Sequence, residues 1–183
     1  MKDKYLNNEI WILTFGGAFQ RANIYKKNYQ EKTRSIFRKK LRNEVERLVH
    51  DKYQKKVTED KHIENIKSIV TFSKELKVGQ VNIPINFGVA QKLLNLYLKY
   101  QWCLGKQKNE PPHFPVDRVI QQELNKIARK HKLTTQDIEP WTQFKDESKY
   151  KKVIDFAKYI RDEVDEYKDF SLAQLELENF NRI

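Results

Sequence analysis

The stretch that decides the fold is VAQKLLNLYLKYQWCL, residues 89–104. On a helix built from this sequence, apolar and aromatic side chains cover almost the whole circumference, and the only charged residues are two lysines. A helix that is apolar all round lies inside its domain. With 16 residues it is shorter than the roughly 20 residues that a membrane span needs. We therefore predict a buried central helix over 89–104, ended by Gly105 at the position where glycine terminates helices.

The rest of the chain predicts further helices around this one. The 183 residues contain only 5 Gly and 5 Pro, and apolar residues recur with the 3.6-residue period of helices. The hydrophobic content of 39% is enough for a core. We expect one all-α domain over residues 1–183, a bundle of about six or seven helices around the central one. The outer helices are predicted at 9–22, 31–56, after Thr58, at 118–130, at 147–168 and after Ser171.

Three features of the predicted helices carry expectations about packing. Gly16 and Gly17 lie inside the first helix, where they weaken it, and lack the spacing of a phosphate-binding loop, so we expect close packing or a kink. The only cysteine, Cys103, ends an apolar run and is expected to be buried. Polar amides on a buried helix need hydrogen-bond partners. Three such amides lie on the predicted central helix and should brace neighbouring loops: Gln91, Asn95 and Gln101.

The charge is concentrated in one segment. The chain carries a net charge of +11, and residues 21–56 hold 13 Lys and Arg against 4 Asp and Glu. Residues 130–183, in contrast, hold 10 basic and 12 acidic side chains. A local excess of positive charge favours polyanionic partners, because cations that contact phosphates release bound counterions.

The basic segment has an ordered pattern. At 3.6 residues per turn, Arg34, Arg38 and Arg42 stack on one face of the predicted 31–56 helix, although like charges there oppose helix formation. Tyr25 and Tyr29 precede them, and they either stack on bases or anchor the segment to the core. The predicted phosphate contacts are Arg34, Arg38, Lys39, Arg42, Lys26 and Lys27.

The stretch EPPHFPVDR, residues 110–118, is the candidate for chemistry. Three prolines fix an extended path around His113. A histidine near an acid suits general acid–base work, which makes His113 and Asp117 catalytic candidates, and Arg118 adds a positive charge at a helix start that can bind anions. The alternative is structural: Asp117 caps the next helix and Phe114 fills the core.

These observations lead to one leading hypothesis and two alternatives. The first is a cytoplasmic protein that binds DNA or RNA through its basic helix, without sequence specificity. The second is a protein-interaction module, an inhibitor or accessory subunit, that acts through the acidic and aromatic C-terminal third; charge asymmetry also allows homo-oligomers. The third is a nuclease-like enzyme using His113 and Asp117. No catalytic motif, metal site or cofactor motif is recognised, and no membrane segment is predicted.

Overall fold

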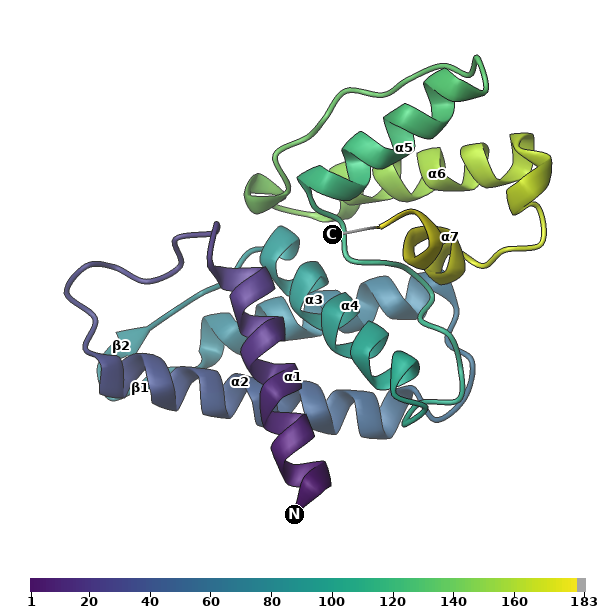
Figure 1. The fold of residues 1–183 in the computed structure, drawn as a ribbon. Coiled ribbons are helices and arrows are strands. Elements are labelled where there is room, and N and C mark those ends of the chain that lie inside the picture. Colours follow the sequence, from purple (N-terminus) through teal and green to yellow (C-terminus); the bar gives the residue numbers. More distant parts are fainter. Residues whose placement is uncertain (181–183) are drawn as a thin grey trace.

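The computed structural model describes residues 1–180 and confirms the all-α prediction (Figure 1). Within this range seven α-helices alternate with short connections, and the only strands are two pairs of residues in one small antiparallel hairpin. The elements are α1 (Lys2–Phe19), α2 (Glu31–Lys52), α3 (Glu59–Glu75), β1 (Lys77–Val78), β2 (Val81–Asn82), α4 (Phe87–Cys103), α5 (Arg118–Lys130), the 3₁₀ turn η1 (Trp141–Gln143), α6 (Glu147–Glu163), the 3₁₀ turn η2 (Asp165–Tyr167) and α7 (Leu172–Asn179).

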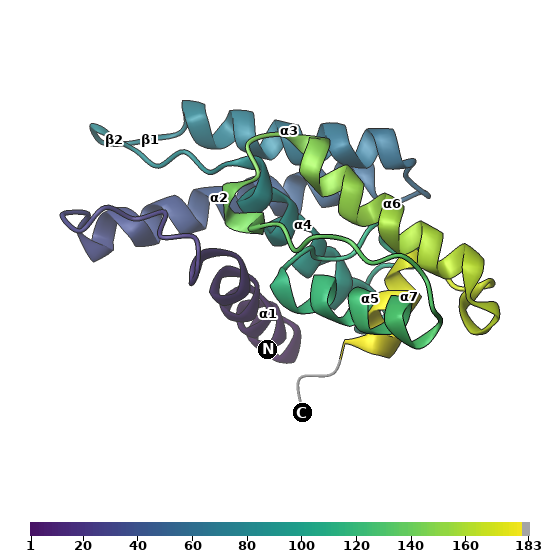
Figure 2. The ribbon, with the colours of Figure 1, turned by 90° about the horizontal axis from the view of Figure 1, so that it is seen from above.

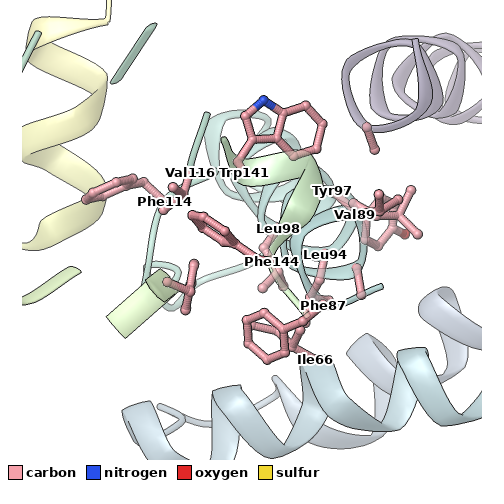
Figure 3. Packing of buried hydrophobic residues seen from close by; sticks show 14 of the residues in the cluster. Ile66, Phe87, Val89, Leu94, Tyr97, Leu98, Phe114, Val116, Trp141 and Phe144 are labelled. Atoms are coloured by element: carbon pink, nitrogen blue, oxygen red, sulfur yellow. The ribbon is translucent and has the colours of Figure 1, made fainter. Parts of the chain in front are cut away.

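The central helix is α4, as predicted. Every residue from 87 to 98 is buried, and α4 packs against α1 on one side and α3 on the other. Figure 2 shows α5, α6 and α7 gathered beside the α1–α4 group. Figure 3 shows side chains from the loops, among them Phe114 and Phe144, meeting α4 residues such as Leu94 in the core. Burial of this apolar surface supplies the main favourable contribution to folding.

Several helix ends follow the predicted capping chemistry. Thr58 accepts a hydrogen bond from the Lys61 amide at the start of α3, and Ser171 and Gln174 form a complete capping box at α7. Gly105 has a φ of +67°, the left-handed conformation expected just after α4. Asp117 caps α5 by accepting hydrogen bonds from the amides of Val119 and Ile120. These caps confirm the predicted boundaries of α5 and the start of α7.

The predicted bounds of α1 were wrong. The helix starts at Lys2 rather than near Glu9 and ends at Phe19 rather than Ala22. Asn7 lies inside the helix, and its side-chain amide donates to Glu46 on α2. Asn23 takes a φ of +48°, which is incompatible with a continuing helix.

Two other helices end earlier than predicted. Helix α2 stops at Lys52 instead of Lys56, because Tyr53 turns into the core and its hydroxyl meets Nδ1 of His62 at 2.8 Å. Helix α6 stops at Glu163 instead of Lys168, where Val164 adopts an extended backbone and is buried. In both places burial of one side chain overrides the helical pattern.

The two neighbouring glycines of α1 have different surroundings. A Cβ on Gly17 would lie 2.7 Å from Cδ1 of Leu96, so Gly17 allows α1 to approach α4, as predicted. A Cβ on Gly16 would meet nothing within 4 Å. Close packing within the chain therefore explains Gly17 and not Gly16.

The prediction that Cys103 is buried was wrong, since this thiol is exposed. The last turn of α4 emerges from the core, and Leu104 is exposed as well. The apolar pattern of the sequence continues past the point where neighbouring helices cover α4. Across residues 1–180, no helix has the length and the apolar content to cross a bilayer.

Candidate functional site

A groove lies between α1 and α2, beside the basic segment. Its volume is about 860 Å³. Figure 1 shows α1 crossing α2, with residues 20–30 forming the loop that joins them. The lining residues are Asn8, Trp11, Ile12, Phe15, Gly16, Phe19, Gln20, Asn23, Ile24, Tyr25, Lys27, Arg34, Ser35, Arg38, Lys39 and Arg42.

The α2 side of this groove is cationic. Of the described residues that line it, five are Lys or Arg and none is Asp or Glu. The structure therefore brings Arg34, Arg38, Lys39 and Arg42 together, as the helical spacing predicts, and adds Lys27 from the loop. Lys26 is exposed in the same loop but is not part of the lining. Positive charge in a concave, partly apolar surface focuses the potential felt by an anion.

Two of the arginines are held by carboxylates from outside the lining. Nε of Arg42 lies 3.0 Å from Glu46, and its Nη1 donates to Asn8 at 2.8 Å. Arg38 forms an ion pair with Glu31. The pairing lowers the net charge at the groove, and it also fixes the position of both guanidinium groups.

Arg34 has a different environment. Its guanidinium carbon lies 5.2 Å from the centre of the Tyr25 ring, a cation–π contact. Its Nε is buried without a hydrogen-bond partner. Buried donors are normally satisfied, so this group has unused hydrogen-bonding capacity at the groove.

The α1 side of the groove is apolar and aromatic. Trp11 is buried beneath Arg42, whose guanidinium carbon lies 5.8 Å from the centre of the Trp11 ring. The indole Nε1 of Trp11 donates to Glu46 at 2.7 Å. Ile12 remains 63% exposed although it lines the groove, and Phe15 is half-buried. Of the two tyrosines in the basic segment, Tyr25 lines the groove, whereas Tyr29 anchors the loop by donating to the carbonyl of Asn82 at 3.3 Å.

The second candidate region places His113 in a closed polar cluster. His113 is only 1% exposed, and its Nδ1 lies 2.9 Å from the hydroxyl of Tyr150. Its ring meets the ring of His62 edge-on at 5.0 Å. Burial lowers the pKa of both histidines, and that of His62 falls well below the usual 6.5.

The polar cluster continues from His113 to Asn95 and Glu59. Nδ2 of Asn95 donates to the carbonyl of Phe114 and to the hydroxyl of Tyr150, each at 3.0 Å. A ring proton on Nε2 of His113, with the Tyr150 hydroxyl donating to Nδ1, is compatible with these contacts. Nε2 of His113 lies 3.6 Å from Oε2 of Glu59, which is also paired with Lys158. Interaction with His113 and with Lys158 lowers the pKa of Glu59 to about 2.

The buried amides of α4 support this arrangement. Gln91 exchanges two hydrogen bonds with the backbone of Val116, and Asn95 holds the carbonyl of Phe114. Both brace the loop after α4, as predicted. Gln101 is buried but its Nε2 has no hydrogen-bond partner, so the bracing role holds for two of the three amides.

Asp117 and Arg118 lie in a different environment from His113. Oδ2 of Asp117 lies 2.9 Å from Nζ of Lys92, and both side chains are buried. Its other oxygen caps α5, so a carboxylate of the chain already occupies the N-terminus of that helix. Arg118 is exposed beside a smaller hollow of about 400 Å³ near Glu139. Asp117 thus has the capping role that the structural alternative predicted.

The C-terminal third uses its aromatic residues internally. Tyr167 is buried, and its ring lies 5.7 Å from the ring of Phe170 in a tilted arrangement. The carboxylate of Glu176 pairs with Lys99 of α4 at 2.6 Å. Exposed acids such as Asp165 and Asp169 remain at the surface. The proposed contact surface of the interaction module is therefore acidic with little exposed aromatic area.

Residues 1–180 contain no group of three or more His, Cys, Asp and Glu side chains that could hold a metal ion. Comparison with protein-family models, with curated proteins and with solved structures gave no match. The functional argument therefore rests on the geometry of this chain.

The apolar side of the groove was not predicted as part of a site. Trp11, Ile12 and Phe15 come from a segment that looked like an ordinary buried helix. One signal was present: EIWILTF, residues 9–15, has more apolar faces than one core contact can bury.

Proposed function

We propose that this protein binds nucleic acid through the groove between α1 and α2. One observation carries the proposal: five cations, three of them on successive turns of α2, line a single groove whose lining contains no acid among the described residues. Phosphate groups are the anions that such a row suits, because each contact releases a counterion. Sequence specificity is not expected, since the groove presents charge and apolar surface and no motif that reads base edges.

Three cations are the most available for phosphate. Within residues 1–180, Lys27, Arg34 and Lys39 form no ion pair with an acidic side chain, whereas Arg38 and Arg42 are paired. If these three contact phosphates of a single strand, log affinity should fall against log salt with a slope of about −2.

The test is fluorescence anisotropy with labelled DNA and RNA at about 50 mM and about 200 mM salt. Lys39→Glu reverses one exposed charge in the groove, and Lys152→Glu reverses one exposed charge on α6. Both variants change the net charge equally. Weaker binding for Lys39→Glu alone supports a local site. Absence of binding at about 50 mM salt, or indifference to salt, refutes the proposal.

The proposed location is the cytoplasm. A single cysteine that is exposed as a free thiol suits a reducing compartment. Nucleic acid is also accessible there.

A further inference from the structure

The cation row is long compared with a single anionic group. From Arg34 to Arg42 the α2 axis rises about 12 Å, at 1.5 Å per residue. Arg34, Arg38 and Arg42 all line the groove over this length. A ligand with one carboxylate would use one of them, whereas a ligand with regularly repeated anions would use the whole row.

The opposite side of the groove suits flat apolar surfaces. Ile12, Phe15 and Phe19 of α1 face the cations across the groove, and Tyr25 and Trp11 each carry an arginine over their rings. Duplex nucleic acid keeps its base faces inside and presents phosphate, so it would leave this apolar side uncovered. Unpaired bases stack on aromatic, apolar and guanidinium surfaces while their phosphates contact lysine and arginine.

Gly16 is the second observation that favours an occupant with flat faces. It lies within the α1 helix, lines the groove and is exposed, and a Cβ there would meet no protein atom. Glycine weakens a helix interior, and no packing within the chain requires it here. The missing side chain leaves an open, shallow place between Ile12 and Gln20, one turn away on each side.

We propose that the groove binds single-stranded nucleic acid, with unpaired bases on the Ile12–Gly16–Phe15 side and phosphates on the cationic side, chiefly at Arg34 and Lys39 of α2 and Lys27 of the loop. This rests on the proposed nucleic-acid function and names the form of the ligand. The charged row sets the attraction to any polyanion, and the apolar side sets the preference for unpaired bases.

The test compares labelled oligonucleotides of about 10 residues, a length within the usual range of single-strand sites. Oligo(dT) and oligo(U) serve as single strands, and a hairpin with a G·C-rich stem of about 10 base pairs, which stays paired at about 50 mM salt, serves as the duplex. The expected result is binding of a single strand about 10-fold tighter than the duplex, since stacking of one or two bases contributes an effect of this size.

Matched variants locate the stacking surface. Ile12 and Leu13 are adjacent, apolar and exposed on α1, but only Ile12 lines the groove. Ile12→Ser should weaken single-strand binding about 5-fold and leave duplex binding unchanged, whereas Leu13→Ser should change neither. Gly16→Leu should also weaken single-strand binding while its melting temperature does not fall, because leucine is the better helix former.

Three outcomes would overturn the inference. The first is duplex that binds as tightly as the single strand; with a steep salt dependence this leaves the general nucleic-acid function in place. The second is an equal effect of Ile12→Ser and Leu13→Ser. The third is a Glu-rich helical peptide that displaces the bound strand and binds more tightly, which would assign the groove to an acidic protein partner. If neither form of nucleic acid binds at about 50 mM salt, the proposed function itself fails.

Discussion

Replacement of Asp117 tests whether this residue belongs to the fold or to chemistry. Its carboxylate caps α5 with one oxygen, which accepts hydrogen bonds of 2.8 and 3.0 Å, and pairs with Lys92 through the other. Losing a cap costs about 1 kcal/mol. Removing one member of a buried ion pair costs about 3 to 5 kcal/mol, because the remaining charge stays in a poorly solvated place. Asp117→Ala should therefore lower the free energy of unfolding by about 4 to 6 kcal/mol.

A double-mutant cycle separates the two contributions. Asparagine caps a helix about as well as aspartate, so Asp117→Asn should keep the cap and lose only the charge balance, at a cost of about 3 kcal/mol. Adding Lys92→Met removes the ammonium as well and should restore most of that loss. Urea denaturation measures each step. If Asp117→Asn and the double variant are equally stable, or if Asp117→Ala loses less than about 1 kcal/mol, the buried pair is not what holds α5 to α4.

Three further predictions follow from the glycines, the buried histidines and the cap of α7. A Cβ on Gly88 would lie 1.8 Å from the backbone oxygen of Trp141, so Gly88→Ala should destabilise the protein by about 3 kcal/mol or more in urea titration. Gly16→Ala should instead stabilise it by about 0.5 to 1 kcal/mol. Equal effects of the two substitutions would contradict the packing of η1 on α4. Burial holds His62 and His113 neutral in the fold. Below about pH 6.5 the unfolded chain therefore binds more protons, and stability should fall by up to about 1.4 kcal/mol per pH unit for each histidine. His62→Gln should flatten this fall in urea titrations between pH 7 and pH 5, whereas the loss linked to Glu59 should appear only between pH 4.5 and about 2. Ser171→Ala removes a two-way capping box and should lower the stability measured by thermal unfolding by about 1 kcal/mol, while Ser171→Asp should lower it less. If Ser171→Ala leaves the stability unchanged, packing alone positions α7.

Much of the helical fold could be predicted from the local pattern of apolar and capping residues. The central helix was predicted because its apolar residues leave no polar face. The predicted range of α5 agrees with the structure, in which Asp117 caps the helix. The errors at α2 and α6 share one cause. At Tyr53 and Val164 burial of one side chain ends the helix before the helical pattern of the sequence does.

In the candidate site, too, some features follow from local sequence and others only from tertiary contacts. The sequence by itself determined the row of Arg34, Arg38 and Arg42, because helical spacing alone sets which side chains share a face. Only the tertiary structure decided what faces that row. The crossing of α1 over α2 places Ile12 and Gly16 opposite the cations, and folding of the loop after α4 buries His113 against His62. Helix faces follow from local geometry, whereas grooves and buried clusters form between elements whose relative position depends on the whole core.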